Sequence, residues 1–172
     1  MLVLTKTIKP KALKAKEMRL ALLNAMGKME TVVKKDFRDT TKTWKHKPVF
    51  ESLISLRQAA GPVLFVFTQD KIYGYVDKGT RPHEIWAGYY TGKSDKKTLA
   101  FPSAFTPKTT PGSLKSGPGS SGGDTVFTPY VEHPGTKPRD FTGQIKKLEE
   151  PKFKRAMEAA MKQARSVSGN PA

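Results

Sequence analysis

Three histidines, His46, His83 and His133, are the side chains of this chain best suited to proton transfer or metal binding. They lie far apart and show none of the short spacings that place two imidazoles on one face of a helix. A zinc site built from His83, His133 and a carboxylate such as Asp77 would require their segments to be neighbours. Solvated turn histidines are the more common outcome, so we expect neither a metal site nor a cofactor.

Other catalytic signatures are equally sparse. The tetrapeptide at 91–94 (TGKS) matches the end of a phosphate-binding loop, but the first glycine of that motif would fall on Ala87. There is no nucleophile elbow and no acid pair in apolar surroundings. The absence of cysteine from the chain excludes disulfides, thiolate ligands and cysteine nucleophiles. These patterns favour a protein that is not an enzyme.

A phrase that occurs twice is the most specific pattern of the sequence. Residues 75–83 read YVDKGTRPH, and residues 130–139 read YVEHPGTKPR. Each copy has an aromatic residue, a valine and a carboxylate, followed by Gly-Thr, a cation and proline. Tyr and Val suit a strand end, and the remainder suits a turn. We therefore expect two neighbouring turns that flank paired strands at one edge of one sheet.

The two turns supply the candidate site. Their glycines allow positive φ, and the prolines that follow fix the direction in which the chain leaves. Their cations would face either a polyanion or an acidic protein surface. The candidate interface or DNA-facing residues are Lys78, Gly79, Thr80, Arg81, Gly135, Thr136, Lys137 and Arg139.

The charge of the whole chain is strongly positive, with 31 Lys and Arg against 15 acids and a formal net charge of +16. This excess favours a polyanionic partner, either nucleic acid or an acidic protein. The cations are spread over the sequence, and no zinc finger, RNA-recognition signature or basic zipper is present. A solvated basic face is an equally good interpretation of many of these lysines.

Apolar periodicity predicts the elements that hold these turns. The N-terminal pattern indicates a long helix, and Pro151 is expected to open a second helix that ends before Gly169. Together they predict an α+β fold, with an antiparallel β-sheet and the two helices packed across it. The expected elements are a helix over 10–40, a strand or short helix over 50–57, a turn at 61–62, strands over 63–68, 72–76, 84–86, 98–101 and 125–131, and the C-terminal helix.

The length of 172 residues suggests a single domain over 1–172, with a loop insertion at 106–124. That loop holds five Gly, three Pro and four Ser, a composition that does not build a core. We expect that this loop is either ordered by a neighbouring subunit or mobile. The N-terminal apolar stretch is too short for a signal peptide, and no run of residues is long enough for a membrane span, which favours a soluble, cytoplasmic setting.

The order of these features resembles the head–tail joining, or tail-completion, proteins of long-tailed bacteriophages. The specific part of the match is the phrase at 75–83, an apolar strand at 99–102 and HPGTKP at 133–138. It spans roughly Ile72 to Phe141, and the flanking helices match in kind. The loop at 106–124 is an insertion relative to that family.

This resemblance implies a structural virion protein at the head–tail junction, made in the cytoplasm of the bacterial host. It implies an α+β fold, no enzymatic activity and a homo-oligomeric ring, a hexamer or a dodecamer, whose partners are adjoining neck or tail-tube proteins. In such a ring the turn cations would either line a DNA passage, through non-specific phosphate contacts, or dock on an adjoining ring. Docking is favoured because strand-end turns more often contact protein. The main alternative is a stand-alone basic nucleic-acid-binding protein.

Overall fold

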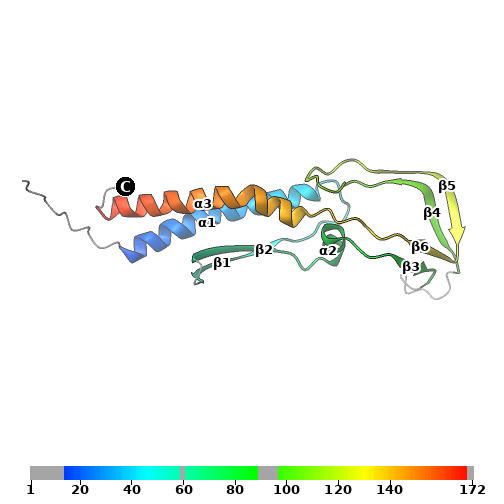
Figure 1. Cartoon of the computed structure of the whole chain (residues 1–172), viewed down its shortest axis with the longest axis horizontal. Coiled ribbons are helices and arrows are strands. Elements are labelled where there is room, and N and C mark those ends of the chain that lie inside the picture. The colour runs from blue at the N-terminus through cyan, green and yellow to red at the C-terminus, as the bar shows by residue number, and fades with distance from the viewer. Residues whose placement is uncertain (1–13, 59–60, 89–96, 170–172) are drawn as a thin grey trace, which may run out of the picture. The chain divides into compact units, whose positions relative to one another are not determined.

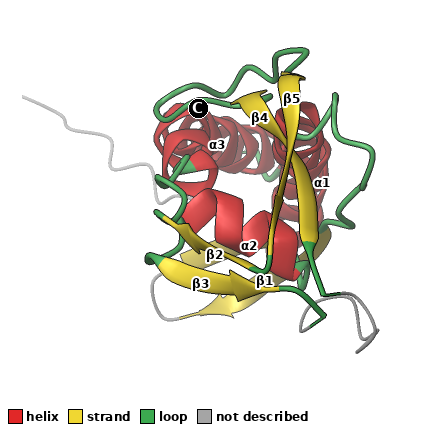
Figure 2. Ribbon diagram, turned by 90° about the vertical axis from the view of Figure 1, so that its right-hand side faces the viewer, coloured by secondary structure: helices red, strands yellow, loops and turns green. Residues whose placement is uncertain are grey.

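The computed structural model describes residues 14–58, 61–88 and 97–169 (Figure 1). The expected α+β class is confirmed by two long helices and antiparallel strands. Among the described residues the strands form three two-stranded ribbons, β1–β2, β3–β6 and β4–β5, rather than one sheet (Figure 2). The elements are α1 (Ala15–Thr40), β1 (Glu51–Gln58), β2 (Gly61–Phe67), α2 (Lys71–Lys78), β3 (His83–Trp86), β4 (Leu99–Thr106), β5 (Ser120–Thr128), β6 (Tyr130–His133) and α3 (Phe141–Val167).

The chain gathers into two compact units. The first combines Met1–Val33, Ser52–Val66 and Leu148–Ala172, and the second combines Lys34–Glu51 and Phe67–Lys147. Helices α1 and α3 contribute residues to both, so the units share their longest elements. The sequence, by contrast, offers no sharp change of composition that would indicate this division.

The first unit is built on the contact between α1 and α3, which run antiparallel (Figure 1). Its buried core consists of Leu22, Met26, Met157 and Ala160. Three residues of the β1–β2 ribbon, Ile54, Leu56 and Leu64, pack against this core. The buried pairs Leu22 and Met26, and Met157 and Ala160, are spaced by three or four residues, as expected for the inner face of an amphipathic helix.

The core of the second unit is a cluster of aromatic rings around Tyr73 on α2. The Tyr73 ring lies 5.1–6.3 Å, between centroids, from the rings of Phe37, Trp44, Phe50 and Phe141. Only 3% of Tyr73 is exposed. This burial raises the pKa of its hydroxyl well above the usual value. The cluster fixes α2, which leads directly into the first Gly-Thr turn.

The predicted strand at 72–76 is wrong, because these residues belong to helix α2. The Asp70 side chain caps this helix by accepting from the Tyr73 backbone N–H at 2.7 Å. Tyr73 and Asp77 are buried, whereas Tyr75 is exposed. A strand would place all three on one face, since its side chains alternate. A helix buries Tyr73 and Asp77 on one face and leaves Tyr75 in solvent. This burial therefore outweighs the intrinsic strand propensity of Tyr and Val.

The predicted start of the C-terminal helix at Pro151 is also wrong, because α3 begins at Phe141 and Pro151 lies inside it. The cap comes from a distant residue: the Asp77 carboxylate accepts from the Thr142 backbone N–H at 3.0 Å and from its hydroxyl at 2.7 Å. The fully buried Phe141 and Ile145 anchor the early turns. This anchoring offsets the hydrogen bond that Pro151 cannot donate.

Three further expectations are resolved. Residues 51–58 form a strand, as one of the two interpretations of this segment predicted, whereas Gly61 and Pro62 lie within β2 rather than in a turn. The loop expected at 106–124 is shorter, because β4 extends to Thr106 and β5 begins at Ser120.

The loop at 107–119 packs on its own chain, contrary to the expectation that its composition forbids this. Lys108 Nζ donates to the Thr43 carbonyl at 2.6 Å, and the hydroxyl of Ser116 contacts that of Thr43. Thr109 is buried. Hydrogen bonds within the second unit therefore take the place of an apolar core in ordering this loop.

Candidate functional site

The two Gly-Thr turns lie side by side, which confirms the central prediction of the repeat. Thr80 N donates to the Thr136 carbonyl at 3.0 Å, and Thr136 N donates to the Thr80 carbonyl at 3.2 Å. Thr136 N also approaches the Thr80 hydroxyl at 2.9 Å. Next to this bridge, β3 and β6 pair antiparallel (Figure 1). The turns therefore flank paired strands, as expected.

The pairing brings like residues together across the two strands. One register runs through the bridge and the ribbon, and it sets Thr80 opposite Thr136. The further partners are His83 with His133, Glu84 with Glu132, Ile85 with Val131, and Trp86 with Tyr130. Reading residues 136 to 130 backwards gives TGPHEVY, which matches TRPHEIW at 80–86. This reversed match is the sequence signal for the register, and the forward repeat alone does not reveal it.

Two glycines make the close approach of the turns possible. Gly79 has φ 77° and Gly135 has φ 82°. A Cβ on Gly135 would lie 2.3 Å from the Thr80 carbonyl oxygen, and one on Gly79 would lie 2.5 Å from that of Thr136. Both conformation and space therefore require glycine at these positions.

A second set of hydrogen bonds ties the copies together at the end of α2. Arg139 N donates to the Val76 carbonyl at 3.0 Å, and Asp140 N donates to the Asp77 carbonyl at 2.9 Å. These bonds satisfy carbonyl groups that the last turn of a helix leaves without a partner. The repeat thus forms a rigid frame that joins α2, the ribbon and the start of α3.

The four candidate cations differ in exposure. Lys78, Arg81 and Lys137 are exposed, whereas only 8% of Arg139 is exposed. Arg139 Nε donates to the Thr109 hydroxyl at 3.2 Å, and its Nη1 donates to the Lys137 carbonyl at 3.1 Å. Arg139 therefore secures the 107–119 loop and is corrected from a surface cation to a structural one.

His83 and His133 face each other, with ring centroids 5.0 Å apart. The Arg81 carbonyl lies 2.9 Å from His83 Nδ1, and Gly135 N donates to His133 Nδ1 at 3.0 Å. Asp77 lies elsewhere as the cap of α3, so the combination of His83, His133 and Asp77 considered for zinc does not form. Within the described residues, no group of three or more potential ligands is placed to hold a metal ion.

An aromatic pair and two carboxylates share the exposed face of the β3–β6 ribbon. The rings of Trp86 and Tyr130 stack at 5.0 Å and 23°, and 51% and 43% of these residues are exposed. Trp86 Nε1 donates to Glu84 Oε2 at 2.9 Å. Glu132 lies directly opposite Glu84. None of these four residues is among the candidate site residues that the sequence suggests.

The β4–β5 ribbon is exposed over almost its whole length. Apart from Leu99, Phe101 and Thr128, every residue of its two strands is exposed. Phe105 is 74% exposed and Phe127 is 69% exposed. We call this ribbon the arm. The arm therefore leaves two large apolar rings in solvent.

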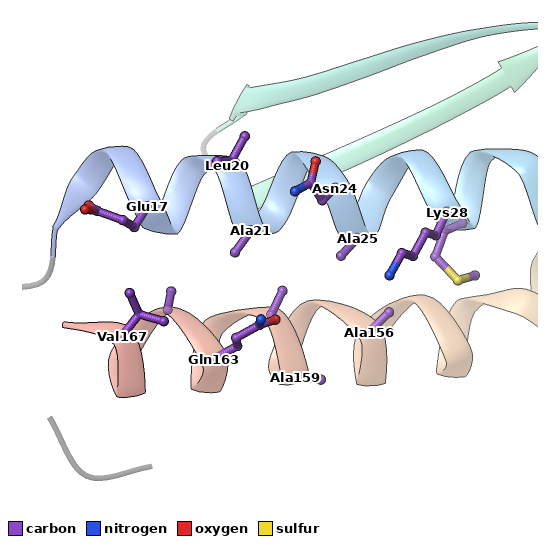
Figure 3. Close-up of a pocket in the computed structure, with 13 residues that line it drawn as sticks. Glu17, Leu20, Ala21, Asn24, Ala25, Lys28, Ala156, Ala159, Gln163 and Val167 are labelled. Atoms are coloured by element: carbon purple, nitrogen blue, oxygen red, sulfur yellow. The ribbon is translucent and has the colours of Figure 1, made fainter. Parts of the chain in front are cut away.

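The first unit carries an apolar groove between α1 and α3 (Figure 3). Its walls contain small residues, including Ala21, Ala25, Ala156 and Ala159. Glu17 and Lys28 are the charged groups at its edge. Among the described residues, its lining contains no histidine and no cluster of acids.

No helix within the described ranges has the length and apolar character needed to cross a membrane. No protein-family model matches the chain, and no curated protein and no solved structure is significantly similar to it.

Proposed function

We propose that this chain is a structural subunit of a homo-oligomeric ring at the head–tail junction of a tailed bacteriophage. The observation that carries the assembly part of this proposal is the exposed arm, with Phe105 and Phe127 largely in solvent. A two-stranded ribbon is marginally stable on its own in water, and it gains stability when another surface covers it. A neighbouring subunit supplies such a surface.

A contact between two different surfaces would favour a ring. In the proposed assembly the arm of one copy contacts a surface other than the arm on the next copy. Contacts between two different surfaces are head-to-tail, and they close into a ring when the rotation between copies allows. Apolar residues exposed on other elements, such as Leu53 and Phe65, offer further contact area.

The phage assignment rests on the repeat. The phrases at 75–83 and 133–138 resemble those of head–tail joining proteins, and in this chain they form one frame with Thr80 bridged to Thr136. A rigid frame suits a subunit that has no catalytic role and that positions neighbouring subunits. The exposed cations Lys78, Arg81 and Lys137 would then meet either DNA or an acidic protein surface.

The net charge of +16 is the one observation that favours the alternative, a stand-alone nucleic-acid-binding protein. Salt dependence separates the two. A stand-alone binder holds short duplex DNA as a monomer, and its affinity falls steeply with salt, by a log–log slope of about −0.9 per phosphate contact. A ring subunit binds such DNA weakly until it has assembled.

The decisive experiment deletes the coding region from the phage or prophage genome that carries it and complements it in trans. We expect deletion to yield separate heads and tails by electron microscopy, with wild-type chain restoring joined, infectious particles. Phe105→Ser/Phe127→Ser should fail to restore them, whereas Val49→Ser, an equally exposed apolar position outside the arm, should succeed. Joined particles in the absence of the chain would refute the proposal.

A further inference from the structure

We propose that Glu84, Glu132, Trp86 and Tyr130 form a docking face for the exposed cations of a second copy of this chain. This inference rests on the proposed ring and names one of its contacts. The face, called here the acidic–aromatic face, receives the Lys78, Arg81 and Lys137 side chains of the neighbouring copy.

The geometry of the ribbon gathers the four side chains on one side. Residues two apart on a strand share a face, as do residues directly opposite each other, so Glu84, Trp86, Tyr130 and Glu132 point the same way. The hydrogen bond from Trp86 to Glu84 at 2.9 Å agrees with this placement. All four are exposed in the isolated chain.

This face is electrostatically incomplete. Glu84 and Glu132 lie directly opposite each other, an arrangement in which like charges destabilise a sheet. Neither carboxylate forms an ion pair within the part of the chain that the structure describes. A cation placed between them would remove the repulsion, and the stacked rings beside them would add an attractive π surface for it.

Charge complementarity points to a second copy as the source of that cation. The chain carries 31 cations against 15 acids, so the surface of another copy is mostly basic. Lys78, Arg81 and Lys137 are exposed and lack ion pairs among the described residues. Arg81 and Lys137 belong to the bridged turns, a frame rigid enough to hold a contact. An acidic face and a basic turn on one subunit provide the two different surfaces of a head-to-tail contact.

The first test uses Glu84→Gln/Glu132→Gln in the full chain, with Glu150→Gln/Glu158→Gln as a control that removes two exposed carboxylates from α3. Sedimentation velocity over a range of protein concentrations and of NaCl measures self-association. We expect the first variant to weaken association at least tenfold and to reduce its salt dependence. Its Tm should stay unchanged or rise, because the repulsion between Glu84 and Glu132 is gone. The control should associate like wild type.

The second test exchanges the charges. Glu84→Lys/Glu132→Lys and Lys78→Glu/Arg81→Glu/Lys137→Glu should each fail to self-associate, because each variant sets like charges against each other. An equimolar mixture should associate, because every contact in an alternating assembly then joins opposite charges. Each variant must be folded for the mixture to assemble. Assembly of the mixture would therefore also show that the substitutions leave both chains folded.

The outcomes distinguish this inference from the ring itself. If Glu84→Gln/Glu132→Gln associates with the same affinity as the wild-type chain, the acidic–aromatic contact is overturned. The proposed ring is not affected by this result. An equal loss in the control shows an effect of net charge alone and overturns the contact as well. Failure of the mixed variants to associate counts against it in the same way. A wild-type chain that stays monomeric at every concentration overturns both proposals.

Discussion

At the scale of single residues, the backbone contacts of the two Gly-Thr turns account for their composition. Gly135 has a positive φ and no room for a Cβ, and Thr80 and Thr136 exchange both of their backbone hydrogen bonds. The sequence predicts this closeness because it repeats the phrase. It does not predict that Arg139 is buried, since only the folded loop at 107–119 brings the Thr109 hydroxyl to its guanidinium.

We predict that Gly135→Ala destabilises the chain far more than Gly112→Ala. Both glycines have positive φ, but nothing lies within 4 Å of a Cβ on Gly112, whereas one on Gly135 would meet the Thr80 carbonyl at 2.3 Å. Backbone strain alone costs about 1–2 kcal/mol. The clash should raise the loss at Gly135 to about 3 kcal/mol or more. Urea unfolding measures both, and equal losses would contradict the geometry of the paired turns.

At the scale of elements, the long helices and most strands follow from periodicity, whereas α2 and the start of α3 do not. Tyr73 and Val76 favour a strand by type, and Pro151 is a common first residue of a helix. Contacts between residues far apart in sequence outweigh both preferences. Tyr73 packs in the cluster of aromatic rings, and Asp77 caps α3 at Thr142. Local patterns cannot reveal a cap supplied from 65 residues away.

We predict that the cap of α2 makes stability depend on acidic pH. The hydrogen bond from the His46 side chain, followed by that from Tyr73 N, holds the pKa of the Asp70 carboxyl below its usual value. A depressed folded pKa stabilises the fold above the unfolded value, and this contribution disappears as pH falls through the folded pKa. Asp70→Asn should therefore cost about 0.5–1 kcal/mol at pH 7. This difference should begin to shrink only below about pH 4 and should vanish below the folded pKa of Asp70.

The control for this prediction is Asp124→Asn, which changes an exposed carboxylate of β5. Denaturant unfolding at pH 7, 5, 4 and 3 gives the free energy of unfolding for each variant. If Asp70→Asn stays less stable than wild type by the same amount at every pH, the ionised carboxylate is not the source of the cap's strength.

At the scale of the whole molecule, composition predicts a basic protein and apolar periodicity predicts α+β architecture, but neither predicts where the contact surfaces lie. The exposure of Phe105 and Phe127 cannot be read from the sequence, because phenylalanine is a residue type that is more often buried. The acidic–aromatic face is hidden in the same way until the register sets Glu84 opposite Glu132 and Trp86 opposite Tyr130. These surfaces can be recognised only when the pairing of the strands is known.

The most direct test of the central claim, assembly into a ring of identical subunits, is the mass of the purified chain in solution by light scattering after size exclusion. We predict one closed species whose mass is an integer multiple of 19.0 kDa, and a shift of Phe105→Ser/Phe127→Ser towards the monomer at the same concentration. A wild-type mass of 19.0 kDa at every concentration up to about 1 mM, where even weak association of about −4 kcal/mol would be visible, would contradict the account.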